Sequence, residues 1–141
     1  MGGAFPGDIA RNSLFLNPGS SNRWVKLRLV GTRSNRAAIG ARIAITLSGP
    51  GGERMLHRTV SSGASFGANC LRQEIGIGNA TSIDKVEVRW PGNPTLQVFK
   101  GLRPGQSYQL QEDHPEATRQ ILHGVLLGNR ASTTPTSSGQ P

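Results

Sequence analysis

The chain has little cysteine and few aromatic residues: one Cys, two Trp, one Tyr and four Phe among 141 residues. A single cysteine, Cys70, excludes an intrachain disulfide and the paired-cysteine zinc patterns. No run approaches the roughly 20 apolar residues of a membrane-spanning helix. Residues 2–7 lack the basic start and apolar run of a signal peptide. A long helical period is also missing, whereas 19 glycines and nine prolines favour short strands joined by tight turns.

Acidic residues are scarce in the first half of the chain. Between Arg11 and Arg58, nine basic residues face one acid, Glu53, while the rest of the chain balances seven against seven, and the formal net charge is +8. A basic half can attract nucleic acid, acidic polysaccharide or an acidic protein. A solvated arginine-rich surface with no partner explains the same charge.

Apolar residues recur at every second position in several short segments, the period of half-buried strands. Turn residues separate these segments about every ten residues, which is typical of a β-sandwich. We therefore predict an all-β fold, an antiparallel β-sandwich of about seven short strands. The expected strands are Trp24 to Val30, Ile39 to Leu47, Met55 to Val60, Leu71 to Ile77, Ile83 to Trp90, Leu96 to Phe99, and Tyr108 to Glu112.

The stretch from Ser34 to Ile43 is expected to contain a polar, basic turn followed by the start of a buried strand. Ser34 and Asn35 favour a turn because their side chains bond to nearby backbone. Ile39 and the alternate residues after it are expected to face the core, which leaves Arg42 on the other face. Gly40 has no Cβ, so we expect a close approach of a neighbour to its backbone.

The domain boundaries follow the same patterns. We expect an irregular lead-in, or the end of a missing upstream repeat, over residues 1–13, a sandwich over 14–113, and a tail over 114–141. The tail could hold one short helix over 117–127 and is otherwise expected to be disordered, since residues 130–141 contain no large apolar residue. Phe66, in a run of small residues, is expected to fill the core.

No catalytic constellation, metal-ligand pattern or cofactor motif is apparent. His57 lies in a predicted strand, and His114 and His123 lie at or beyond the predicted domain's end. Asp84 and Glu87 would serve a carbohydrate-active enzyme only if they flanked a cleft. No catalytic, metal or cofactor residue is therefore predicted.

Two tryptophans and the cysteine differ in their expected exposure. Trp90 has the parity of Val86 and Val88 and is expected in the core, followed by Pro91, which ends the strand. Trp24 has the parity of Lys26 and is a candidate surface contact. Cys70, beside apolar residues, is expected to be buried.

Six blocks in order carry a resemblance to a known family: residues 10–19, 22–25, 31–43, 63–67, 75–78 and 86–91. The sharpest is Gly31-Thr32-Arg33-Ser34-Asn35-Arg36-Ala37-Ala38-Ile39-Gly40-Ala41-Arg42-Ile43. The chain resembles the ASPIC/UnbV domain, the carboxyl-terminal module of FG-GAP/VCBS-repeat proteins that include the cartilage acidic protein group. The resemblance implies a secreted or cell-surface parent with an upstream calcium-binding propeller of FG-GAP repeats as a partner. It brings no established catalytic residues.

These observations favour a non-enzymatic module for extracellular binding, adhesion or structural capping. The candidate contact residues are Arg33, Asn35, Arg36, Arg42 and Trp24, and the expected partner is an acidic glycan or acidic protein surface. A purely structural role for the basic loop, in which Asn35, Arg36 and Arg42 tie loops together by hydrogen bonds, is the nearest alternative. Nucleic-acid or acidic-polysaccharide binding by the basic half is the next, although so few aromatics leave little for base stacking. A carbohydrate-active enzyme is the last.

Overall fold

The computed structural model describes residues 17–63 and 67–122, and over these ranges the chain is all-β with no helix. Eight strands form two four-stranded sheets, which confirms the predicted β-sandwich. The strands are β1 (Arg23–Val30), β2 (Arg42–Gly49), β3 (Gly52–Thr59), β4 (Gln73–Gly78), β5 (Ser82–Arg89), β6 (Leu96–Phe99), β7 (Gln106–Gln111) and β8 (Thr118–Gln120).

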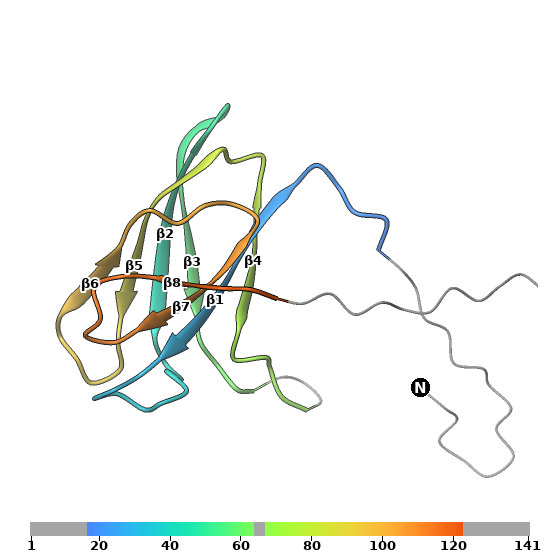
Figure 1. The fold of residues 1–141 in the computed structure, drawn as a ribbon. Coiled ribbons are helices and arrows are strands. Elements are labelled where there is room, and N and C mark those ends of the chain that lie inside the picture. Colours follow the sequence, from blue (N-terminus) through green and yellow to red (C-terminus); the bar gives the residue numbers. More distant parts are fainter. Residues whose placement is uncertain (1–16, 64–66, 123–141) are drawn as a thin grey trace, which may run out of the picture.

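The first sheet has the order β4-β1-β7-β8 and the second has the order β3-β2-β5-β6 (Figure 1). All neighbouring strands are antiparallel except β1 and β7, which run parallel, with Leu27 beside Tyr108 and Leu29 beside Leu110. This pair departs from the purely antiparallel expectation because the two strands lie far apart in the sequence and need no tight hairpin between them.

The core lies between the inner faces of the two sheets, where alternate residues of the strands meet. Trp90 and Phe99 are among the largest fully enclosed side chains, so Trp90 is buried as its parity predicts. The aliphatic part of this core comes from both sheets: Val25, Leu27, Leu29, Ile75, Ile77 and Leu110 from the first, and Ile43, Ile45, Leu47, Ile83, Val86 and Val88 from the second.

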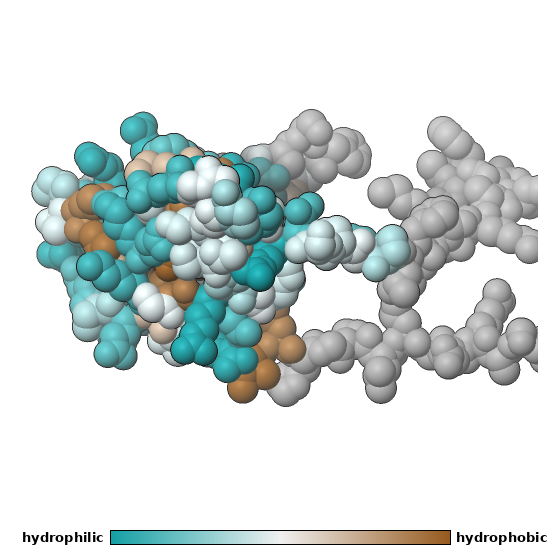
Figure 2. Space-filling view, turned by 90° about the horizontal axis from the view of Figure 1, so that it is seen from above, coloured by the Kyte–Doolittle hydropathy of each residue, from teal (hydrophilic) through white to brown (hydrophobic). Residues whose placement is uncertain are grey.

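Four connections lie at one end of the sandwich: residues 31–41, the described parts of the connection between β3 and β4 (60–63 and 67–72), 90–95 and 112–117. We call this end the loop end. The described chain enters β1 at the opposite end. Seen from that opposite end, the surface is mainly hydrophilic, with one group of hydrophobic side chains on the side where β6 lies and another at the lower edge of the view (Figure 2). Leu96 and Val98 of β6 are among the exposed apolar residues.

The strand predicted from Ile39 begins three residues later, at Arg42, and Ile39 itself is 41% exposed. Two hydrogen bonds explain the difference: the Asn35 amide donates to the Ile39 carbonyl oxygen, and the Ile39 N–H donates to Asn35 Oδ1, both at 2.9 Å. The side chain of Asn35 thereby holds residues 35–39 in a turn, and the alternating pattern starts only at Ala41, which is buried.

The role predicted for Gly40 was partly wrong. Its φ is 92°, in the region that side chains disfavour, whereas a Cβ placed on this residue would have Pro91 Cγ as its nearest neighbour, at an ordinary 3.6 Å. The backbone conformation therefore requires glycine there, and close approach does not.

Two further expectations fail, and several others fall outside the described residues. The first described residues of the 117–127 segment form β8, because Thr118 to Gln120 pair with Ser107 to Gln109 of β7 and are extended rather than helical. Cys70 is exposed because it precedes β4, whose first residue is Gln73. Phe66, His123, the lead-in over 1–13 and the segment 130–141 lie outside the described residues.

Candidate functional site

Basic side chains concentrate at the loop end. Arg33 pairs with Asp113 at 2.6 Å and Arg72 pairs with Glu74 at 3.0 Å. Among the described residues, five further arginines at or beside this end have no carboxylate within salt-bridge distance: Arg28, Arg36, Arg42, Arg58 and Arg89. Because a guanidinium carries its charge at every physiological pH, this end of the sandwich is positively charged.

The loop that follows β1 is organised around one buried carboxylate, Glu112, which is 1% exposed. Glu112 Oε2 accepts hydrogen bonds from the backbone N–H groups of Thr32 and Arg33 at 2.9 Å and of Ser34 at 2.8 Å. Successive backbone N–H groups directed at one point form an anion-binding nest. Here the protein fills that nest with its own side chain.

The second oxygen of the same carboxylate joins two loops. Glu112 Oε1 accepts from the Asn93 amide at 3.2 Å and lies 2.9 Å from the Ser34 hydroxyl. That hydroxyl also lies 2.8 Å from the Pro91 carbonyl oxygen and can donate to only one of the two acceptors at a time. Segments 31–41, 90–95 and 112–117 are thus tied to a single group.

The protonation state of Glu112 follows from these contacts. Burial by itself would raise the pKa of the carboxyl, but hydrogen bonds from the Ser34 backbone, the Asn93 amide and the Thr32 backbone outweigh it and lower the pKa from 4.5 to about 2. Glu112 is therefore ionised at neutral pH, and its charge is taken up by backbone donors rather than by an arginine.

The turn after β1 also depends on Gly31. A Cβ on this residue would lie 2.8 Å from the Ser34 carbonyl oxygen and closer still to that of Asn35. The Gly31 N–H donates to the Arg36 carbonyl oxygen at 3.3 Å, and the Ala38 N–H donates to that of Asn35 at 2.8 Å. The loop therefore folds back over the end of β1.

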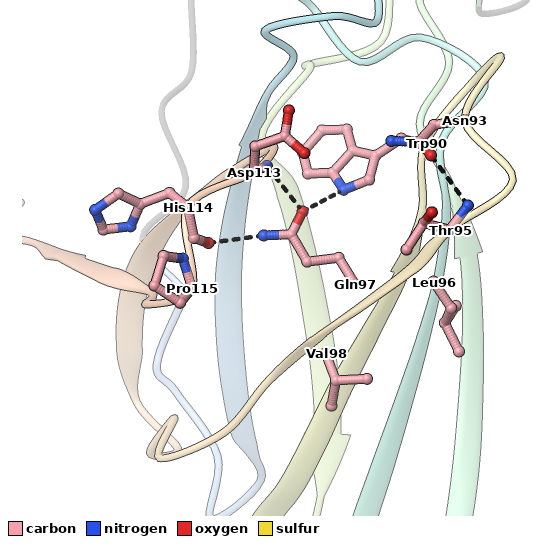
Figure 3. Close-up of a pocket in the computed structure, with 9 residues that line it drawn as sticks. All are labelled: Trp90, Asn93, Thr95, Leu96, Gln97, Val98, Asp113, His114 and Pro115. Atoms are coloured by element: carbon pink, nitrogen blue, oxygen red, sulfur yellow. Dashed lines mark hydrogen bonds between the residues drawn. The ribbon is translucent and has the colours of Figure 1, made fainter.

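Gln97 links the two sheets on the side where β6 and β8 form the edges (Figure 3). Its Oε1 accepts from Trp90 Nε1 at 2.8 Å and from the Asp113 N–H at 3.3 Å. Its amide donates to the carbonyl oxygens of Gln111 at 3.1 Å and His114 at 2.7 Å. A cavity of about 320 Å³ lies beside it, while Leu96 and Val98 point away from this network (Figure 3).

The predicted contact residues do not lie on one face of the sandwich: all but Trp24 are at the loop end, but on different sheets. Arg36 lies beside the outer face of the first sheet, whereas Arg42 lies on the second sheet opposite Arg89. Asn35 is occupied within its own turn, as the purely structural alternative expects, but Arg36 and Arg42 have no such bond among the described residues. Trp24, 40% exposed, is the second residue of β1, at the far end, and its ring centroid lies 5.2 Å from the Lys26 ammonium.

Sequence reasoning missed Arg28, Arg89, Glu112 and Gln97 as parts of this end. The alternation in each strand did place Arg28 and Arg89 on outward faces, so their exposure was predictable. Their neighbours were not, because the pairing of β1 with β7 brings Arg28 beside Gln109, 81 positions further along the chain.

The candidate catalytic residues lie apart. His57 is exposed on β3 and His114 lies in the turn after β7. Asp84 accepts from the Ser48 and Ser82 hydroxyls, which lower its pKa, and Glu87 pairs with Lys85 at 3.1 Å. Neither carboxylate lines the cavities beside Gln97 and Arg36. The described residues contain no group of three or more metal-ligating side chains.

The fold and these contacts define a β-sandwich module with a basic loop end. The family model described as ASPIC and UnbV matches residues 31–117, more than half of the chain. The chain therefore belongs to the ASPIC and UnbV family, a non-catalytic domain family found in proteins associated with FG-GAP repeats. No curated protein and no solved structure matches the chain. In the part of the chain that the structure describes, no helix has the length and apolarity that a membrane crossing requires.

Proposed function

We propose that this chain is a non-enzymatic binding module whose loop end contacts an acidic partner, either an acidic glycan or an acidic protein surface. The observation that carries the proposal is the group of arginines at this end without a carboxylate partner among the described residues. Exposed like charges repel one another, so an anionic partner would be favoured there.

The contact residues of this proposal differ from those expected from the sequence. Arg33 is paired with Asp113, and Asn35 holds its own turn. Arg36 and Arg42 remain as contacts, joined by Arg28 and by Arg89, the cross-strand neighbour of Arg42. Trp24 stays a separate candidate at the other end.

The connection to FG-GAP repeats suggests the module's setting. In a secreted or cell-surface parent, an upstream propeller would be joined through the segment that precedes β1. That segment reaches β1 at the end opposite the loop end (Figure 1). A propeller attached there would leave the arginines of the loop end accessible to another partner.

The test compares two double variants of equal charge. Arg36→Gln/Arg42→Gln removes two charges at the loop end, and Lys100→Gln/Arg103→Gln removes two exposed charges near the other end. On a heparin column, the loop-end variant should elute at lower salt. Its affinity for heparin should fall roughly 5-fold to 30-fold, the effect of two exposed contacts of about 0.5–1 kcal/mol each. The control should stay within twofold of the parent.

If both double variants lost heparin affinity equally, binding would depend only on net charge, and the proposal would be refuted. Duplex DNA as a second probe addresses nucleic-acid binding: each phosphate contact adds about 0.9 to the slope of log affinity against log salt. A steep slope with DNA, together with weak heparin binding, would favour that rival instead.

A further inference from the structure

A cavity of about 360 Å³ lies on the outer face of the first sheet, at the loop end. Such a volume is at the lower end of the range of small-molecule sites. We call it the Arg28–Arg36 cavity. Its polar lining consists of the guanidinium groups of Arg28 and Arg36 and the side-chain amides of Gln109 and Gln111. Its apolar lining is largely aliphatic and includes Val30 and Leu71.

The register of two parallel strands sets the floor of this cavity. Arg28 of β1 is beside Gln109 of β7, and Val30 is beside Gln111. Neighbouring strands lie about 4.8 Å apart, and alternate residues share a face, so these four side chains form a square on the outer surface. Val30 is 9% exposed although it points away from the core between the sheets, which makes it an apolar floor.

The loop after β1 supplies the wall. Arg36 and Ala37 follow the three residues whose N–H groups bind Glu112, and Gly31 permits the loop to fold back. The carboxylate of Glu112 thus fixes the segment that carries Arg36. Arg36 and Arg28 line the same cavity, and neither pairs with an acid among the described residues.

The polar groups of the cavity are free to bind a ligand. Within the described residues, no hydrogen bond or ion pair involves the side chains of Arg28, Arg36, Gln109 or Gln111. Two guanidinium groups match a carboxylate, which they can bind through paired N–H donors. Two amides, each a donor and an acceptor, match vicinal hydroxyl groups, and the aliphatic floor suits the C–H face of a sugar ring.

We infer that the Arg28–Arg36 cavity binds a sugar acid, a pyranose ring that carries a carboxylate, within an acidic polysaccharide. This inference rests on the proposed function and names the unit that the module recognises. A sulfate group alone would use the guanidinium groups and leave both amides and the aliphatic floor without a partner. An extended peptide that binds by adding a strand would need a free strand edge, whereas β1 and β7 both lie inside the sheet.

The experiment uses the full chain, labelled with nitrogen-15, and three oligosaccharide probes. The first is an unsulfated oligosaccharide of glucuronate and N-acetylglucosamine, and the second is the same oligosaccharide with its carboxylates reduced to alcohols. The third is a sulfated oligosaccharide with its carboxylates reduced. The readout is the side-chain NH₂ signals of Gln109 and Gln111, assigned by their loss in Gln109→Leu and Gln111→Leu.

The first probe should shift both amide signals, and both reduced probes should bind at least roughly tenfold more weakly, since a charged hydrogen bond contributes about 1.5–3 kcal/mol. Gln109→Leu and Arg36→Gln should each weaken binding of the glucuronate probe, whereas Lys100→Gln/Arg103→Gln, near the other end, should leave it within twofold of the parent. Arg36→Gln should also lower heparin retention.

The two proposals fail in different ways. If heparin retention depends on the loop end but the glucuronate probe leaves both amide signals unchanged, the sugar-acid site is wrong and the proposed function stands. Equal binding of the sulfated, carboxyl-reduced probe also overturns the sugar-acid site. If heparin retention ignores the loop-end arginines, the proposed function fails first.

Discussion

Replacing Glu112 by glutamine tests whether one carboxylate holds the loop end together. The change keeps the shape of the side chain but removes its charge, and it leaves one acceptor oxygen where the carboxylate has two. The N–H groups of Thr32, Arg33 and Ser34 converge on Oε2, so at least part of this set loses its acceptor.

The pKa gives the magnitude. A fall from 4.5 to about 2 corresponds to about 3 kcal/mol of folding free energy at neutral pH, because one pKa unit equals 1.36 kcal/mol. The folded-state pKa is lowered, so this stability is fully present above about pH 4.5 and is lost as the pH falls towards 2. We expect Glu112→Gln to unfold about 2–4 kcal/mol more easily at pH 7.

The assay is urea unfolding of the full chain, followed by the fluorescence of the buried Trp90, at pH 7 and pH 3. The gap between parent and Glu112→Gln should narrow by about 2 kcal/mol at pH 3, because at that pH Glu112 is protonated in the unfolded chain while it stays largely ionised in the folded one. Glu116→Gln, at an exposed acid without a described side-chain bond, is the control and should show no such gap. If the difference in unfolding free energy between parent and Glu112→Gln did not change with pH, or if the variant lost no stability at pH 7, the Glu112 carboxylate would not hold the loop end together.

Two further substitutions test the contacts around this end. Gly31→Ala should destabilise the fold by about 1–3 kcal/mol, because its Cβ meets two backbone carbonyl oxygens. Gly51→Ala is the matched control, since a Cβ there meets nothing within 4 Å. Equal urea midpoints for the two variants would contradict the predicted clash at Gly31. Gln97→Leu should cost about 2–3 kcal/mol in the same assay, because the N–H groups of Trp90 and Asp113 lose their acceptor. An unchanged urea midpoint for Gln97→Leu would contradict this prediction and would show that water accepts these two hydrogen bonds instead.

Alternation in the sequence was a good guide to the inner faces of the strands. It separated Trp90, 2% exposed, from Trp24, 40% exposed, and it located the hairpin of β2 and β3. It worked there because burial on one face of a strand leaves a period of two in the residues themselves.

Alternation of apolar residues failed to predict exposure where a hydrogen bond from a side chain before the strand fixes the backbone conformation. Ile39 has the parity of the core residues after it but is exposed, since Asn35 bonds to its backbone. The three residues of β8 are too few to show a period, and they are extended because β7 offers a partner.

The loop end could be predicted only in part for a different reason. The excess of arginine is visible in the composition, but the role of Glu112 depends on N–H groups 78–80 positions earlier in the chain. The Arg28–Arg36 cavity depends equally on the parallel pairing of β1 with β7. Contacts between segments so far apart leave no local pattern to read.

Backbone amide shifts of the full chain during titration with a heparin-type oligosaccharide show whether the arginines of the loop end contact an acidic partner. We expect shifts at residues 28–42, at Arg89 and at residues 109–111, with little change around Trp24 and Arg103. Shifts centred on Trp24, or spread evenly over both ends of the sandwich, would show that the loop end is not the contact surface.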